Sequence, residues 1–200
     1  MSSEKEHSIK DDLWAKFVNG EKTAFTSIYN QYVDALFAYG SKLSLDTELV
    51  KDCIQDIFIE LYTRRRQLSE PRVIKYYLFK MLKNGILKKL KKERRTSSIS
   101  ELNDSFFFAE YNVENKTIDL EIDDNKRRLI SKTLKSLTDK QQEILYLRFT
   151  MEFDYREISE IIGIDHNSVR KQVYRAIKKL RESDAFKNNI NIILFYSSIY

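Results

Sequence analysis

Residues that make tight turns are scarce in this chain: its 200 residues include only four Gly and one Pro. A sheet-rich fold needs many tight turns, and such turns draw on these two residue types. The hydrophobic share of 42% is still large enough to build a packed core, so a wholly disordered chain is excluded. The sequence therefore predicts an all-α fold, and its length suits one or two domains.

Several classes of site find little support in the composition. Cys53 is the only cysteine, which argues against a disulfide framework or a cysteine-based zinc site. The two histidines, His7 and His166, lie far apart in sequence. We therefore expect no metal site, no cofactor and no catalytic residue. The polar N-terminus shows no signal peptide, and no apolar run reaches the ~20 residues of a membrane span, so we expect a cytoplasmic protein without membrane insertion.

The net charge of +5 conceals a strong segregation along the chain. Residues 64–95 carry 13 basic and two acidic groups, and residues 126–182 carry 14 basic and eight acidic groups. Between these blocks, residues 96–125 carry one basic and eight acidic groups, while residues 1–63 have a net charge of −5. Two basic blocks separated by an acidic stretch suggest two sites for a polyanion.

Apolar residues at helical spacing predict three helices between residues 8 and 95, which form the expected first domain. The first stripe comprises Phe25, Ile28, Tyr29, Tyr32, Val33, Leu36 and Phe37. After a break near Ser41 to Leu45, the second stripe comprises Leu49, Val50, Cys53, Ile54, Ile57, Phe58, Leu61 and Tyr62. The third helix follows Pro71 and is expected to bury Ile74, Tyr77, Leu78, Met81, Leu82 and Ile86.

Two of these helices also carry polar residues that suit a binding role. Asp46 or Thr47 can cap the second helix, whose other face is acidic and suits a basic partner surface; its candidate binding residues are Asp52, Gln55, Asp56 and Glu60. The third helix offers a cationic groove for single-stranded DNA, and its candidate residues are Lys80, Lys83, Asn84 and Lys88. We interpret Cys53 as a small core residue, because it lies on the apolar stripe.

Residues 96–120 lose the helical periodicity and form an acidic linker, although Phe106, Phe107 and Phe108 are apolar enough to dock on another part of the molecule. The second domain is expected over residues 121–183. An apolar tail, residues 184–200, follows. We expect this tail to pack within the molecule, because exposed apolar patches of that size are rare in soluble monomers.

Start and stop signals in the second domain predict a helix-turn-helix. Thr138 with Gln141 matches a capping box, and Asp154 with Glu157 repeats a similar signal. Gly163 suits a left-handed turn between two helices. Asp165 or Asn167 can cap the last helix. The first helix of such a motif braces the second, which presents its N-terminal side chains to base edges in the major groove. The candidate DNA-binding residues of the last helix are Asn167, Ser168, Arg170, Lys171, Tyr174, Arg175 and Lys178.

Three segments in register resemble the extracytoplasmic-function (ECF) sigma factors of bacterial RNA polymerase. The stretch LTDKQQEILYLRFTMEFDYREISEIIGIDHNSVRKQVYRAIKKLRE is similar to the promoter-reading domain of that family. The segment DCIQDIFIELY resembles its polymerase-binding helix, and YYLFKMLKNGILKKLKKERR resembles its promoter-melting helix. The resemblance covers about residues 20–182. It departs from the family pattern at Lys88, Ser159 and Glu152, the last of which occupies a usual Gly position.

The resemblance implies a function and its partners. The acidic helix would bind core RNA polymerase, the basic helix would capture the melted non-template strand of the downstream promoter element, and the helix-turn-helix would read the upstream element in duplex promoter DNA. An anti-sigma factor would be a further partner. The alternative is a stand-alone helix-turn-helix regulator with an N-terminal dimerisation or ligand-binding module. A nucleic-acid enzyme has less support, because the sequence shows no phosphate loop, cluster of metal-binding carboxylates or Ser/His/Asp arrangement.

Overall fold

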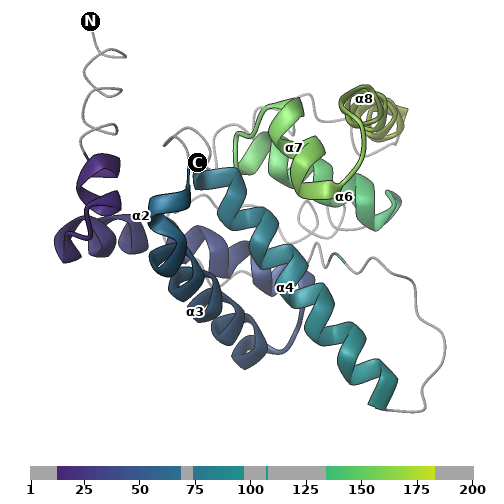
Figure 1. Ribbon diagram of the computed structural model, residues 1–200. Helices are drawn as coiled ribbons and strands as arrows, with labels where there is room; N and C mark the ends of the chain where they lie inside the picture. Colours follow the sequence, from purple (N-terminus) through teal and green to yellow (C-terminus); the bar gives the residue numbers. More distant parts are fainter. Residues whose placement is uncertain (1–12, 69–73, 97–106, 108–133, 183–200) are drawn as a thin grey trace, which may run out of the picture. The chain divides into compact units, whose positions relative to one another are not determined.

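The chain divides into two compact units, Met1–Glu101 and Leu102–Tyr200 (Figure 1). A computed structural model describes residues 13–68, 74–96, 107 and 134–182. Within these ranges all regular structure is helical. The expected all-α fold with two helical domains is therefore confirmed.

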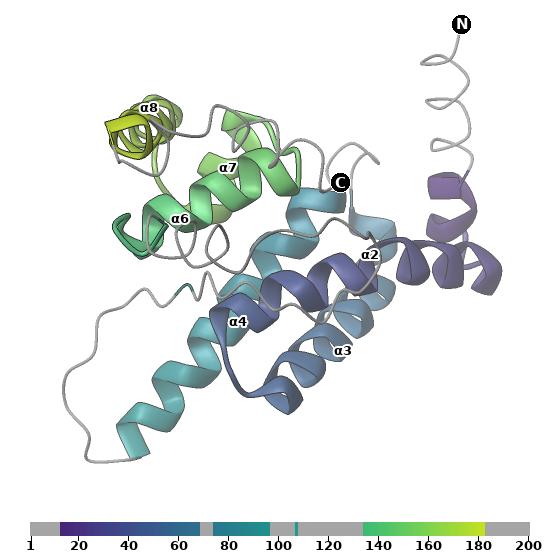
Figure 2. The same cartoon turned by 180° about the vertical axis from the view of Figure 1, so that it is seen from behind.

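The first unit is built on three long helices, α2 (Lys22–Leu43), α3 (Thr47–Arg64) and α4 (Ile74–Thr96). Each of the three packs against the other two, as Figures 1 and 2 show from opposite sides. A 3-10 turn, Arg65–Gln67, follows α3. The C-terminal end of α4 extends beyond α2 and α3 in both views.

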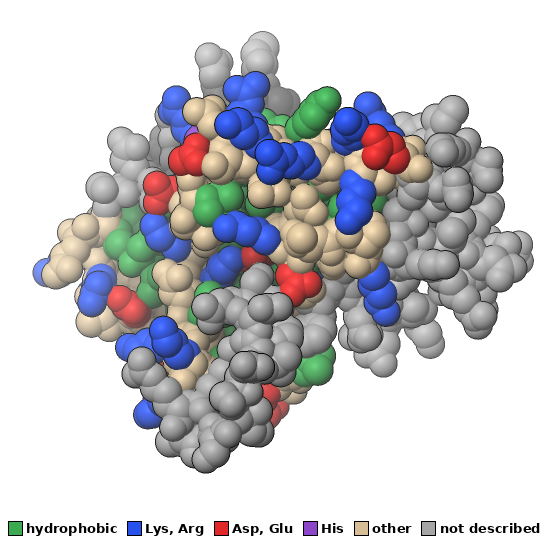
Figure 3. Space-filling view, turned by 90° about the vertical axis from the view of Figure 1, so that its right-hand side faces the viewer, with side chains coloured by type: hydrophobic (Ala, Val, Ile, Leu, Met, Phe, Trp, Pro, Cys, Tyr) green, Lys and Arg blue, Asp and Glu red, His purple; other side chains and the backbone are tan. Residues whose placement is uncertain are grey.

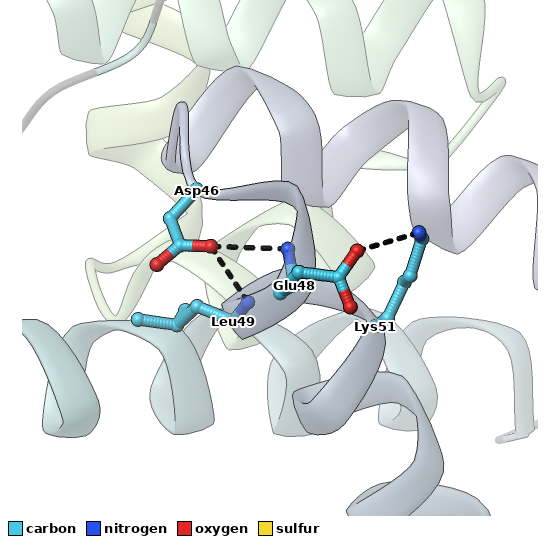
Figure 4. A network of polar contacts seen from close by, with 4 residues as sticks. All are labelled: Asp46, Glu48, Leu49 and Lys51. Atoms are coloured by element: carbon cyan, nitrogen blue, oxygen red, sulfur yellow. Dashed lines mark hydrogen bonds and ion pairs between the residues drawn. The ribbon is translucent and has the colours of Figure 1, made fainter.

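The start of α3 is fixed by Asp46 (Figure 4). Its carboxylate accepts hydrogen bonds from the backbone N–H groups of Glu48 and Leu49, both at 3.0 Å. These two N–H groups belong to the first turn of the helix and have no partner within it. Glu48 in turn pairs with Lys51 at 2.7 Å. Of the two predicted caps, Asp46 rather than Thr47 is therefore the N-cap residue.

The buried stripe of α3 matches its prediction closely, whereas that of α2 does not. In α3 the buried residues are Leu49, Val50, Cys53, Ile54, Ile57, Phe58 and Leu61. Cys53 is 2% exposed, so its assignment to the core is confirmed. In α2 the buried residues are Ala24, Ile28, Leu36, Tyr39, Gly40 and Leu43. Tyr29, predicted on the stripe, is 39% exposed. The helix ends at Leu43, within the break predicted near Ser41 to Leu45.

Gly40 is buried on α2, although the predicted stripe does not include it. A Cβ atom at this position would lie 2.6 Å from Cγ1 of Val50 in α3, and it would also contact Leu82 and Ile86 of α4. All three helices therefore meet at this glycine, and Tyr39 and Leu43 are buried near it in sequence. A stripe of large apolar residues in the sequence does not reveal a close approach at a glycine.

The core face of α4 also differs from its prediction at the aromatic positions. Phe79 is fully buried, and its ring lies 5.1 Å from that of Tyr39 between centroids. Tyr77 and Met81, predicted to be core, are only half-buried. The predictions for Ile74, Leu78, Leu82 and Ile86 are correct.

An aromatic cluster joins residues 13–18, which form a short helical turn, to α2 and α3. Phe17 packs between Trp14 and Phe25, with ring centroids 5.2 and 6.2 Å away. Phe25 in turn contacts the rings of Phe58 and Tyr62. The sequence analysis did not find Trp14 and Phe17, because they precede the first clear apolar stripe.

The second unit contains shorter helices, α6 (Asp139–Leu145), α7 (Tyr155–Ile162) and α8 (His166–Glu182). Both predicted capping boxes are confirmed, Thr138 with Gln141 and Asp154 with Glu157. Gly163 ends α7 with a φ of 74°, in the left-handed region that its position predicted. Glu152 has a φ of 58°, which is unusual for a non-Gly residue and agrees with its place at a usual Gly position.

Two further features complete the second unit. A π-helical turn, Tyr146–Thr150, follows α6, and its register is set by the Met151 N–H, which donates to the Tyr146 carbonyl at 3.1 Å. Phe107 is 5% exposed and packs on the Tyr146 ring, 5.7 Å away between centroids. The predicted docking of this linker is thus confirmed at Phe107. Phe106, Phe108 and the tail, residues 184–200, lie outside the described residues, so the structure does not test the predictions for them.

Candidate nucleic-acid interfaces and acidic face

The outer side of α8 carries a basic face opposite a buried stripe. The buried residues are Val169, Val173, Ala176 and Leu180. The exposed residues, which we call the α8 basic face, are Asn167, Arg170, Lys171, Tyr174, Arg175 and Lys178. Tyr174 is 69% exposed among these cations. The face has no acidic side chain until Glu182, which lies 3.9 Å from Lys178. Six of the seven predicted DNA-binding residues of this helix are therefore exposed together.

The seventh, Ser168, is used to build the start of the helix. The Asp165 carboxylate accepts hydrogen bonds from the backbone N–H groups of Asn167 at 2.9 Å and Ser168 at 3.1 Å. It also accepts a bond from the Ser168 hydroxyl. These bonds, first that of the Ser168 side chain, lower the pKa of Asp165 below its usual range. Asp165 is thus the cap, and Ser168 is half-buried beside it.

Several polar groups fix α8 and α7 to the rest of the unit. The Gln141 amide of α6 donates to the Gln172 side chain of α8 at 3.2 Å. Lys179 donates to the carbonyl oxygen of Ser136. Arg148 donates to the Phe153 carbonyl at 2.9 Å and stacks over the Tyr155 ring at 4.8 Å. Lys179 therefore fixes α8, and Arg148 the start of α7, to other parts of the unit, while the cations of the α8 basic face are exposed.

The candidate residues on α4 are less uniformly exposed. Asn84 and Lys88 are exposed, and Lys80 and Lys83 are half-buried. We call these four the α4 basic face. Figure 3 shows a face on which Lys and Arg side chains are interspersed with Asp and Glu side chains. Phe79 lies in the core, whereas Tyr76 is half-buried and adjoins Lys80 one turn along.

Part of the basic run between α3 and α4 is structural. Arg65 donates to the Tyr62 carbonyl at 2.8 Å, and its guanidinium lies 4.4 Å above the Tyr62 ring. The guanidinium also lies next to Gly20, whose φ is 90°, because a Cβ atom at Gly20 would be 3.3 Å from Arg65 Nη2. Arg65 therefore lies between the end of α3 and the start of the described chain.

The acidic residues of α3 form a continuous exposed face. Asp52, Gln55 and Asp56 are exposed, and Glu60 is half-buried. We call these four residues the α3 acidic face. Asp56 pairs with Lys89 of α4 at 3.0 Å, and Glu60 pairs with Arg64 at 3.1 Å. The sequence analysis overlooked one residue on this side of the helix, Ile59, which is 57% exposed. Its position, off the apolar stripe, is the signal that could have found it.

Among the described residues, no group of three or more His, Cys, Asp and Glu side chains is arranged to hold a metal ion. None of the described helices is long and apolar enough to cross a membrane.

Comparisons with known proteins match both units. A family model for sigma-70 region 2 matches residues 28–96, and one for sigma-70 region 4 matches residues 127–180. The chain is 24% identical over 155 residues to the ECF RNA polymerase sigma factor SigM of Bacillus subtilis (strain 168), an alignment that covers 77% of this chain and 91% of SigM. It is 21% identical over 172 residues to SigW of the same strain, covering 82% and 90%.

Two solved structures have a similar fold. One is the sigma factor RpoE of Bartonella quintana in complex with the anti-sigma factor NepR, with a TM-score of 0.58, 21% identity, and coverage of 82% of this chain and 98% of that chain. The other is CnrH with the cytosolic domain of CnrY, with a TM-score of 0.52, 19% identity, and coverage of 84% and 92%.

Region 2 and region 4 thus occur in one chain, in the order and on the helices that the three sequence segments predicted. A stand-alone helix-turn-helix regulator is not favoured, because it has no need of region 2. The chain belongs to the sigma-70 family and is an ECF sigma factor, which directs the initiation of transcription.

Proposed function

We propose that the three faces divide the work of initiation among them. The α3 acidic face binds core RNA polymerase, the α4 basic face holds the melted downstream promoter element, and the α8 basic face reads the upstream element as duplex DNA. The observation that carries this proposal is the α8 basic face, with its cations exposed on the second helix of a helix-turn-helix.

Position along α8 separates two kinds of DNA contact. Asn167, Arg170 and Lys171 lie in the first turns, which reach base edges when such a helix enters the major groove. Arg and Asn side chains can each form paired hydrogen bonds to a base edge. Arg175 and Lys178 lie further along and suit phosphate oxygens, which contribute affinity without sequence preference.

The α4 basic face suits a single strand. The Asn84 amide offers both a donor and an acceptor to an unpaired base, and the lysines attract phosphates. Because Phe79 is buried, Tyr76 is the aromatic group we assign to stacking. Unstacking a base from duplex DNA costs a few kcal/mol, which stacking on an aromatic ring can offset.

The α3 acidic face suits a basic partner surface. Its ion pair between Asp56 and Lys89 is solvent-exposed, with side chains 66% and 36% accessible. Exposed pairs of this kind contribute about 0.2–1 kcal/mol, so a cation of the polymerase can replace Lys89 at little cost.

We infer a cytoplasmic location, where core polymerase and promoter DNA are found. We also propose an anti-sigma factor as a regulatory partner, by analogy with the complexes of RpoE with NepR and CnrH with CnrY. The division into residues 8–95, 96–120, 121–183 and 184–200 remains our proposed domain organisation.

Run-off transcription with purified core polymerase on genomic promoter fragments tests the function directly, and transcripts should depend on this chain. The chain with Asp52→Lys and Asp56→Lys together should lose polymerase binding and transcription while keeping its circular dichroism spectrum. Asp34→Lys, an exposed charge reversal on α2, is the matched control and should leave binding intact. Unchanged affinity of the double variant would refute the role of the α3 acidic face.

Competition between specific and scrambled duplexes tests the α8 basic face. Arg170→Ala or Lys171→Ala should cost ~1–3 kcal/mol on the specific duplex and reduce the specificity ratio. Lys178→Ala should weaken binding to all sequences and lower the salt slope by about one. An intact specificity ratio in both Arg170→Ala and Lys171→Ala would show that these residues do not read bases.

A further inference from the structure

Ile59 breaks the pattern of its helix. The other aliphatic side chains of α3, namely Leu49, Val50, Ile54, Ile57 and Leu61, are each at most 6% exposed. Ile59 is 57% exposed on the opposite side. A single exposed apolar residue is common on protein surfaces and needs no explanation by itself. The residues around Ile59 indicate that its exposed side chain belongs to a binding surface.

Ile59 lies in the middle of the α3 acidic face. It follows Asp52 by seven residues, Gln55 by four and Asp56 by three, and residues at these spacings share one side of a helix. All three of these neighbours are exposed. An exposed isoleucine therefore adjoins carboxylate and amide groups on its N-terminal side, and Tyr62 and Thr63 follow it one turn on. An apolar anchor beside polar rim groups is a common arrangement in protein interfaces.

The two kinds of group contribute differently to binding. Rim charges steer a partner of opposite charge and exclude wrong partners, but their desolvation offsets much of what they add to affinity. An apolar side chain that leaves water on binding contributes affinity that depends little on salt. A face with charges alone would bind a basic partner weakly at moderate salt.

We propose that Ile59 is the apolar anchor of the polymerase-binding surface and becomes buried against an apolar spot between basic side chains of core RNA polymerase. This inference rests on the proposed function of the α3 acidic face. It adds a specificity-determining residue whose contribution differs in kind from that of the carboxylates.

Affinity for core polymerase, measured over a range of salt concentrations, tests the proposal. Ile59→Ala should weaken binding about tenfold or more at every salt concentration and leave the salt slope unchanged. Asp56→Asn should instead reduce the slope. Leu45→Ala is the matched control, because Leu45 is 71% exposed but lies in the turn between α2 and α3, and it should change affinity less than twofold. Ile59→Ala should also unfold at the wild-type temperature, since little burial is lost.

Three outcomes would overturn the proposal. An unchanged affinity of Ile59→Ala, with binding abolished by Asp52→Lys and Asp56→Lys, would remove Ile59 as the anchor and leave the proposed function standing. Loss of binding in Leu45→Ala to the same extent would show that the effect is unspecific. If Ile59→Ala reduced self-association in sedimentation and left polymerase affinity unchanged, the occupant of the face would be a second copy of this chain. The proposed function fails separately, if the double charge reversal itself has no effect.

Discussion

The helices of the two units are stabilised in different ways. In the first unit, α2 has 22 residues and starts without a side-chain cap, and it packs against both α3 and α4. In the second unit, α6 and α7 have seven and eight residues, and each starts with a complete capping box. Short helices have few internal hydrogen bonds to repay the cost of nucleation, so they depend more on local start signals. A long helix can rely on tertiary packing instead.

The largest expected loss of stability comes from a substitution that disturbs the packing of the first unit. Gly40→Ala should destabilise it, because the added Cβ lies 2.6 Å from Val50 and overpacking of this kind costs about 1–3 kcal/mol. Gly85→Ala is the matched control: its Cβ would meet Cys53 Sγ at 3.7 Å, an ordinary contact, and Ala favours a helix over Gly by ~0.5–1 kcal/mol. Hydrogen exchange of α2–α4 amides should therefore accelerate in the first variant and slow in the second.

The next largest loss of stability is expected from removing the N-cap residue of α7 in the second unit. Asp154→Ala removes the acceptor for the Arg156 and Glu157 N–H groups and should cost ~0.5–2 kcal/mol, seen as faster hydrogen exchange throughout α7. Asp46→Ala removes the same kind of cap from α3, which has 18 residues and packs on two neighbours. There the faster exchange should be confined to the first turn. If hydrogen exchange became faster along the whole of both helices, the two units would not differ in how their helices are stabilised.

The smallest effect concerns the cap of α8 and depends on pH. The pKa of Asp165 is lowered in the folded chain, so the carboxylate stabilises α8 fully above its ordinary pKa of 3.8. This stabilisation is lost as the pH falls through the lower folded value. The amide chemical shift of Ser168 should therefore titrate below pH 3.8. Asp165→Asn should abolish that titration, and its persistence in this variant would assign it to another carboxylate.

Local signals in the sequence predicted the second unit better than the first. Asp154 with Glu157 and Gly163 act through bonds and backbone angles within a few residues, so their roles follow from spacing alone. The sequence did not predict the orientation of α2, nor that Phe79 rather than Tyr77 is buried in α4. Both depend on how three helices pack against one another, and the apolar pattern of a single helix does not contain that information. The π turn after α6 likewise has no sequence signal that we can identify.

The candidate faces were predicted as sets of residues, and the structure shows which of these side chains are exposed and which also make internal contacts. Asn84 and Lys88 are exposed because they lie opposite the α4 core stripe. Ser168 stays a predicted DNA contact, and its hydroxyl also donates to the Asp165 cap, a role that the sequence analysis did not name. Ile59 was assigned to neither the apolar stripe nor the acidic face of α3, although its place off the stripe agrees with its exposure.

The buried thiol of Cys53 gives the protein an internal reporter. It is the only cysteine in the chain, and it lies on the buried side of α3, next to Gly85 of α4. Burial raises the pKa of the Cys53 thiol, although the neighbouring Lys89 opposes this, so the reactive thiolate is scarce while the unit stays closed. The rate at which an alkylating reagent modifies this chain therefore measures how often the first unit opens. The second unit has no cysteine, so it does not contribute to the alkylation rate. The opening rate of the first unit can therefore be measured while the second unit remains bound to DNA.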